Sequence, residues 1–145
     1  MRQTALTLSR IVDETEPRLL QLGEERSSAR PTSERWSKKE VLGHLIDSAS
    51  NNHQRFVRAQ LQERLVFPGY TQAEWNRAQQ YQSEAWENLV RLWAAYNRHL
   101  AHVIEAIPEA AADKICEIGD GKPVSLEFLV ADYITHLEHH LGQIL

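Results

Sequence analysis

The C-terminal stretch of the chain carries apolar side chains at the three-and-four spacing of an α-helix. At about 100° per residue, one arc of this helix collects Leu126, Val130, Tyr133, Leu137, Leu141 and Ile144. Ser125 precedes the run, at a position where a serine hydroxyl commonly caps a helix. A helix with one apolar arc must bury that arc against other elements, so this stretch predicts a packed helical core.

Three earlier segments repeat this periodicity. They run from about Gln3 to Leu22, from Ser37 to about Leu65 and from Ser83 to about Ile107. Ser37 and Glu40 have the spacing of a capping box. Gly23 and Pro108 stand where the first and third segments should end. Four amphipathic helices predict an all-α four-helix bundle.

The connections between these helices are of unequal length. A polar loop is expected from Glu24 to Arg35, and a short segment with a turn and a small extended excursion from Lys114 to Val124. The stretch from Tyr70 to Ser83 predicts one long crossover loop, typical of a lid or binding segment. With 145 residues and no internal repeat, we expect a single domain over residues 1–145.

Composition excludes several classes of protein. A net charge of −4 and a pI near 6.0 argue against a nucleic-acid surface, which carries clustered basic residues. No apolar run approaches the roughly 20 residues of a membrane span, and no signal-peptide pattern follows Met1. The single Cys116 cannot form an internal disulfide, which fits the cytoplasm, and we interpret it as structural.

The terminal helix also carries a pair of histidines at the edge of its apolar arc. His136 and His140 are four residues apart and therefore stack one turn above the other. This is metal-ligand spacing, although two polar residues at the margin of a core would show it too. His139 lies further round the helix and should face solvent. A metal site needs a third ligand from elsewhere in the chain.

Short polar side chains line one flank of the second helix. They are His44, Asp47, Ser48, Asn51 and Arg55. A solvent face more usually carries Lys and Glu, so both a cavity wall and a solvent face fit this stripe. Arg55 lies about 16 Å along the helix from His44 at 1.5 Å per residue. It could bind an anionic part of a substrate or cofactor, or form a buried ion pair.

In this order the motifs resemble the DinB-like (DinB/YfiT) family of metal-dependent four-helix-bundle proteins. The resemblance rests on Trp36-Ser37, Glu40, His44, Asp47, Asn52, Arg55-Phe56, Pro68-Gly69-Tyr70, Trp75, Asp132-Tyr133, His136, His139-His140 and Gln143. It extends from Trp36 to the end of the chain.

The resemblance implies a homodimer with a divalent metal bound by His44, His136 and His140. Three neutral imidazoles would leave the metal its charge and an open position, as in catalytic zinc sites. Zn²⁺ and Ni²⁺ both suit this set. Asp47, one turn from His44, and Gln143, near His140, are the expected outer partners of the ligands.

Three functions remain open at this point. The resemblance favours an S-transferase or isomerase that uses a low-molecular-weight thiol, such as bacillithiol or mycothiol, on a small electrophilic substrate. A hydrolase that uses metal-bound hydroxide needs the same ligands. A non-catalytic dimeric metal-binding bundle is the third. Asp47 and Arg55 are the candidate catalytic residues.

Overall fold

The computed structural model describes residues 1–145 and is mostly helical. The helices are α1 (Arg2–Ser28), α2 (Lys38–Leu61), α3 (Gln72–Gln79), α4 (Trp86–Glu105) and α5 (Leu126–Ile144), with the short 3₁₀ helices η1 (Tyr81–Ser83) and η2 (Glu109–Ala111). The strands are β1 (Arg64–Phe67), β2 (Ile115–Ile118) and β3 (Val124–Ser125). No helix combines the length and apolar character that crossing a membrane would require.

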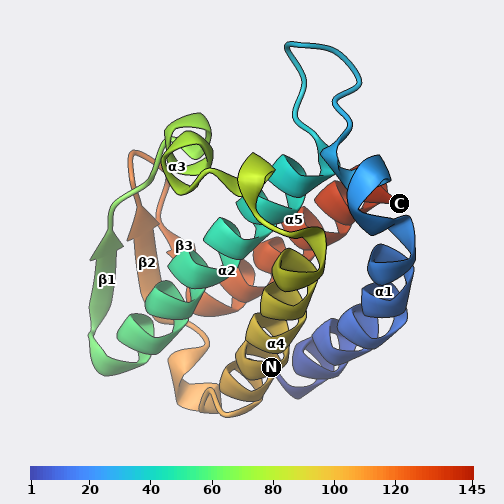
Figure 1. Cartoon of the computed structure of the whole chain (residues 1–145). Coiled ribbons are helices and arrows are strands. Elements are labelled where there is room, and N and C mark those ends of the chain that lie inside the picture. The colour runs from blue at the N-terminus through green and yellow to red at the C-terminus, as the bar shows by residue number, and fades with distance from the viewer.

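The four long helices pack around one hydrophobic core. α1 lies mainly against α4, α4 lies against α2, and α2 lies against α5 (Figure 1). Trp93 of α4, Phe56 of α2 and Leu137 of α5 are fully buried in this core. The helix with the histidine pair is therefore the direct neighbour of the helix with the polar stripe.

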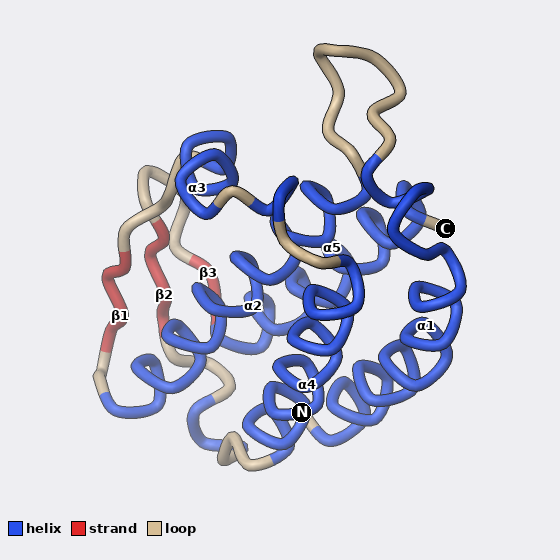
Figure 2. Tube along the Cα trace, viewed as in Figure 1, coloured by secondary structure: helices blue, strands red, loops and turns tan.

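A three-stranded sheet at one end of the bundle departs from the all-α prediction (Figure 2). β1 pairs in parallel with β2, and β2 pairs antiparallel with β3. Leu65 and Cys116 face each other in the register and are both buried against the core. Burial raises the pKa of the Cys116 thiol, in agreement with a structural role.

The prediction for the end of the second helix is wrong because the residues after it pair into the sheet. α2 stops at Leu61 rather than near Leu65, and Arg64–Phe67 forms β1. The partners of β1 lie about fifty residues later in the chain. A local pattern of apolar residues carries no information about pairing with so distant a segment. The predicted long loop from Tyr70 to Ser83 likewise contains α3 and η1.

The predicted helix starts at Ser37 and Ser125 are confirmed. Ser37 and Glu40 form the capping box, and the Ser125 hydroxyl accepts a hydrogen bond from the Phe128 amide. The predicted end at Gly23 corresponds to a break, with φ of 71°, inside the longer α1. The predicted cap at Ser83 is wrong, because α4 begins at Trp86.

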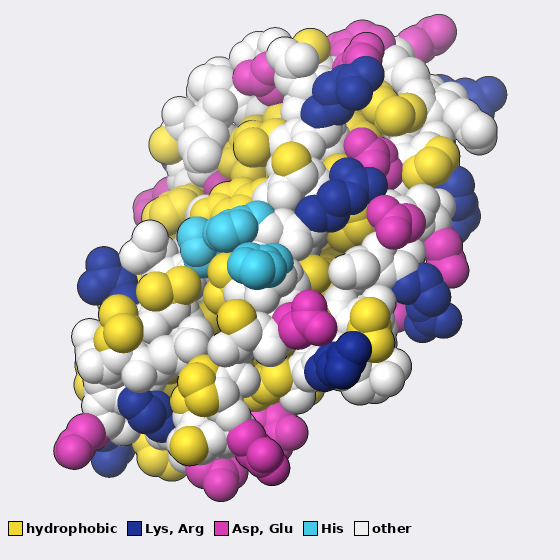
Figure 3. Space-filling view, turned by 90° about the horizontal axis from the view of Figure 1, so that it is seen from below, with side chains coloured by type: hydrophobic (Ala, Val, Ile, Leu, Met, Phe, Trp, Pro, Cys, Tyr) yellow, Lys and Arg dark blue, Asp and Glu magenta, His cyan; other side chains and the backbone are white.

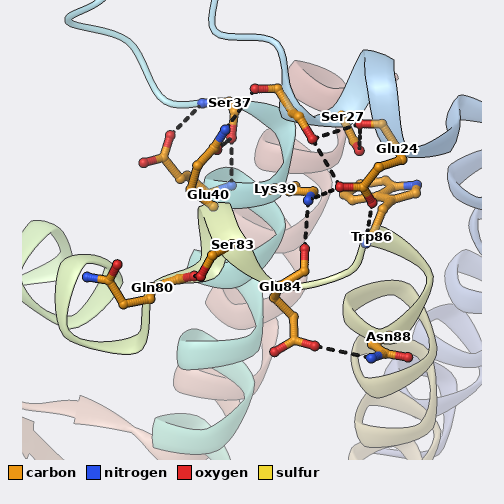
Figure 4. Close-up of polar contacts among 12 residues, drawn as sticks. Glu24, Ser27, Ser37, Lys39, Glu40, Gln80, Ser83, Glu84, Trp86 and Asn88 are labelled. Atoms are coloured by element: carbon orange, nitrogen blue, oxygen red, sulfur yellow. Dashed lines mark hydrogen bonds and ion pairs between the residues drawn. The ribbon is translucent and has the colours of Figure 1, made fainter.

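A polar network joins α1, α2 and the start of α4 (Figure 4). The Glu24 carboxylate accepts a hydrogen bond of 2.9 Å from the Trp86 amide, so α4 receives its cap from another helix. The same carboxylate forms an ion pair with Lys39, which is buried and also donates to the Glu84 carbonyl. This network fixes the N-terminal end of α2, one turn before His44.

Candidate metal centre

Three histidines from two helices converge between α2 and α5. One nitrogen from each of His44, His136 and His140 lies within 4.8 Å of the others. The ring centroids are 4.5 to 5.0 Å apart, with the rings steeply inclined to one another. The structure thus brings together the residues that the resemblance indicated, 92 positions apart for His44 and His136.

Burial keeps His44 and His136 in their neutral form. His44 is fully buried, and burial, followed by the neighbouring His136 and His140, lowers its pKa to about 4. Burial is also the largest cause that lowers the pKa of His136, and nearby Asp132 opposes the effect. Neutral imidazoles have a free lone pair, which is the form that binds a metal.

The donor set fits a divalent cation. The Nε2 atoms of His44 and His136 face each other at 3.1 Å, and Nδ1 of His44 is buried without a hydrogen-bond partner. A cation bound among the three nitrogens would use the converging lone pairs, and nitrogen ligands suit Zn²⁺ and its neighbours in the first transition row.

Two side chains hold the outer nitrogens of the α5 histidines. Nδ1 of His140 lies 2.9 Å from Oε1 of Gln143, and an oxygen acceptor at this position places the imidazole hydrogen on Nδ1. That tautomer leaves Nε2 as the free lone pair. The hydroxyl oxygen of Ser48 lies 3.5 Å from Nδ1 of His136. Ser48 belongs to the polar stripe predicted on α2.

Asp47 does not contact His44, contrary to the expectation that it would orient this ring. It accepts a hydrogen bond of 2.6 Å from the Tyr81 hydroxyl and another from Gln79. Burial raises the pKa of Asp47. Its role is therefore to attach the α3 and η1 segment to α2. The sequence analysis did not identify Tyr81 as a partner of Asp47. The one sequence feature related to this contact is Gly43, which lacks a side chain where the Tyr81 ring packs.

A cavity of about 250 Å³ opens beside the triad. His136 and Ser48 line the end near the histidines, and Arg55 and Tyr70 line it further along α2. Asn51, another member of the predicted stripe, lines a neighbouring cavity instead. The stripe is therefore a cavity wall over much of its length, which distinguishes it from a plain solvent face.

The remaining histidines lie outside this centre. His139 is exposed on α5, as predicted, His99 and His102 are exposed on α4, and His53 is half-buried on α2. The space-filling view shows histidine side chains gathered on one face of the protein (Figure 3). The His53 and His99 rings are 5.1 Å apart and the His99 and His102 rings 6.4 Å apart. The triad is the group whose ligand atoms converge closely enough to hold a metal ion.

Comparison with known proteins gives one family and one curated relative. The profile of the DinB superfamily matches residues 7–144. A protein of Halalkalibacterium halodurans, described as a candidate metal-dependent hydrolase, is 23% identical over 109 residues. The match covers 75% of this chain and 63% of that protein, so the chain spans less than two thirds of the relative's length.

Solved structures resemble the fold over nearly the whole chain. YfiT from Bacillus subtilis, described as a candidate metal-dependent hydrolase with an unusual four-helix-bundle topology, has a TM-score of 0.84 at 16% identity, covering 99% of this chain and 83% of YfiT. The mycothiol-dependent maleylpyruvate isomerase has a TM-score of 0.76 at 14% identity, covering 99% of this chain and 60% of the isomerase. At these identities the likeness establishes the fold alone.

Proposed function

The chain belongs to the DinB superfamily, and from this membership and the triad we propose that it is a divalent-metal-dependent enzyme acting on small molecules. The leading activity is S-transfer or isomerisation with a low-molecular-weight thiol. The observation that carries the proposal is the convergence of three imidazoles at the end of a cavity. Three such ligands leave an open position, which is characteristic of catalytic rather than structural zinc sites.

A divalent cation in this site would deprotonate a bound thiol outright and polarise an electrophile. The protein's own residues prepare the site for this chemistry. His44 is buried and His136 is half-buried, which keeps both rings neutral at pH 7 and ready to bind. Gln143 fixes the His140 tautomer, and Ser48 contacts His136 at the cavity wall. The Trp36 ring, 5.8 Å from that of His44, helps to shield the site from water.

Thiol chemistry suits these surroundings because the cation needs no protein base to activate a thiol. Trp36, Ser48 and Gln143, which contact the triad, are not bases at neutral pH, and the one imidazole beside it, His139, is exposed on the outer side of His140. The fold is also shared with a mycothiol-dependent isomerase.

A metal-dependent hydrolase is the second candidate, and one residue favours it. Asp132 lines the cavity beside His136 and is exposed, so its carboxylate could accept a proton from an attacking water. The curated relative is described as a candidate hydrolase.

The experiment has two stages, carried out on protein without an affinity tag. Elemental analysis should find about one zinc or nickel ion per chain, because one three-histidine site exists. The loaded protein is then assayed with several thiols against a model electrophile and, in parallel, with activated esters. Thiol-dependent turnover supports the leading activity. Ester hydrolysis alone supports the hydrolase, and bound metal without turnover supports the non-catalytic bundle.

The proposal also includes the homodimer implied by the family resemblance. Size-exclusion chromatography with light scattering measures the molar mass in solution. A mass of twice the 16.7 kDa of the single chain supports the dimer, and a mass of 16.7 kDa contradicts it.

A further inference from the structure

Arg55 is a buried cation without an acidic partner. It is 9% exposed, yet none of the ion pairs in the protein includes it. Its only hydrogen bond runs from Nη1 to Oδ1 of Asn52 at 3.4 Å, and its Nε has no partner. Burying a charge without a counterion is unfavourable. The ion-pair alternative for Arg55 therefore fails.

The surroundings of Arg55 hold the guanidinium at the cavity. Its Cζ lies 5.6 Å from the centre of the Phe67 ring, which supports it from β1 through a cation–π contact. Arg55 lines the cavity that also contains Ser48 and His136. The cavity thus connects an unpaired cation with the histidine triad. Burial lowers the pKa of Arg55, but a guanidinium stays charged at neutral pH.

The other groups in the cavity leave the cation free for a ligand. Burial raises the pKa of Tyr70 to about 12, so its hydroxyl remains a neutral hydrogen-bond donor beside Arg55. Asp132 lines the same cavity but is exposed, and no ion pair joins it to Arg55. An anion is therefore favoured at the Arg55 end and repelled at the Asp132 end.

We propose that Arg55 binds a carboxylate of the substrate, whose reactive carbon then lies beside the histidines. The planar guanidinium matches a carboxylate in a paired hydrogen-bond geometry. From Ser48 to Arg55 the helix rises about 10 Å, so several bonds separate the carboxylate from the reacting atom. The cavity of about 250 Å³ restricts the ligand to a small acid. This assignment rests on the proposed function for the chemistry, whereas the anion site itself can be tested alone.

The test measures binding of succinate to the metal-free and the metal-loaded protein by NMR. The wild-type readout is the Nε–Hε signal of Arg55, which requires no variant. Arg55→Gln should weaken succinate binding by about tenfold or more, as expected for loss of charge-assisted hydrogen bonds. Arg55→Lys keeps the positive charge but cannot form the two parallel hydrogen bonds of a guanidinium to a carboxylate, so it should bind succinate more weakly than the wild type. The matched control is Arg58→Gln, an exposed arginine on the same helix that bonds only Gln54.

The expected result is a succinate-dependent shift of the Arg55 signal in both metal states, absent with the uncharged analogue succinamide. Equal binding by the wild type and Arg55→Gln would overturn the proposal, as would tighter binding of inorganic phosphate than of succinate. Succinate binding that requires metal but not Arg55 would place the anion on the metal and would also overturn it. A protein that binds succinate at Arg55 but retains no metal would refute the proposed enzyme while leaving the anion site intact.

The carboxylate could belong to the substrate or to the thiol. Thiol-dependent turnover of a carboxylate-bearing electrophile is therefore compared with turnover of its amide, using a thiol without a carboxylate. Loss of the preference for the acid in Arg55→Gln supports the substrate as the source. Equal turnover of the acid and the amide by the wild type with this thiol would contradict the assignment.

Discussion

Nε2 of His44 and Nε2 of His136 face each other at 3.1 Å across the contact between α2 and α5. Without a cation, one of the two must carry a hydrogen and donate it to the other. Nδ1 of His44, on the other side of the ring, is buried with no partner. A cation between the two rings would instead allow both Nε2 atoms to act as ligands through their lone pairs.

Removing a nitrogen from the triad should remove the metal. His44→Gln and His140→Gln are each expected to lower the affinity for Zn²⁺ by more than the 10- to 100-fold typical of losing an outer-shell partner. Competition with a chromophoric chelator measures the affinity. The matched control is His139→Gln, an exposed histidine on the same helix as His140, which should bind metal like the wild type. Unchanged affinity in His44→Gln would refute the assignment of this ligand.

The stability of the metal-free protein should fall in mildly acidic solution. Burial lowers the pKa of His44 from 6.5 to about 4, so between these values the unfolded chain binds a proton that the folded protein excludes. Stability is therefore fully present above pH 6.5 and declines as the pH falls toward 4, by about 3 kcal/mol for this group. Urea unfolding at a series of pH values measures the decline.

The same measurement on two variants identifies the group responsible. His44→Gln should lose most of the dependence between pH 6.5 and 4, whereas His139→Gln should keep it. A slope that persists in His44→Gln would assign the effect to other residues.

The ion pair between Glu24 and Lys39 should stabilise the bundle only while the carboxylate is charged. The Lys39 ammonium, followed by the Trp86 amide, lowers the pKa of Glu24 below its usual 4.5. Its contribution is present above that value and is lost as the pH falls through the lowered pKa. Glu24→Gln should therefore melt at a lower temperature than Glu25→Gln at pH 7, because only Glu24 contacts the buried lysine. The difference should shrink at acidic pH, and a constant difference would contradict the electrostatic account.

Features that depend on neighbouring residues could be predicted from the sequence. The caps at Ser37 and Ser125 and the long amphipathic helices follow from local signals. Features that depend on distant residues could not. β1 forms because β2 is available to pair with it, and α4 begins at Trp86 because Glu24 of α1 caps its amide.

In the candidate site, too, local features could be predicted from the sequence and long-range contacts could not. The spacing of His136 and His140 indicates a shared helix face. His44 was identified as the third ligand only through the family resemblance, because no local pattern connects α2 with α5. Asp47 was expected beside His44 because it lies nearly one turn away on the same helix. It points instead to Tyr81, whose position depends on how η1 packs on α2.

Two glycine substitutions should have opposite effects on stability. A Cβ at Gly43 would lie 2.2 Å from the Tyr81 ring, so Gly43→Ala must displace the ring and with it the hydrogen bond to Asp47. Overpacking of this kind costs about 1–3 kcal/mol, more than the roughly 0.5–1 kcal/mol that alanine normally gains over glycine in a helix. A Cβ at Gly142 of α5 would meet nothing within 4 Å, so Gly142→Ala should be stabilising. Thermal unfolding measures both effects, and near-ultraviolet circular dichroism reports the displaced Tyr81. A stabilised Gly43→Ala protein would show that η1 can move away from α2 without loss, and that Asp47 does not hold it there.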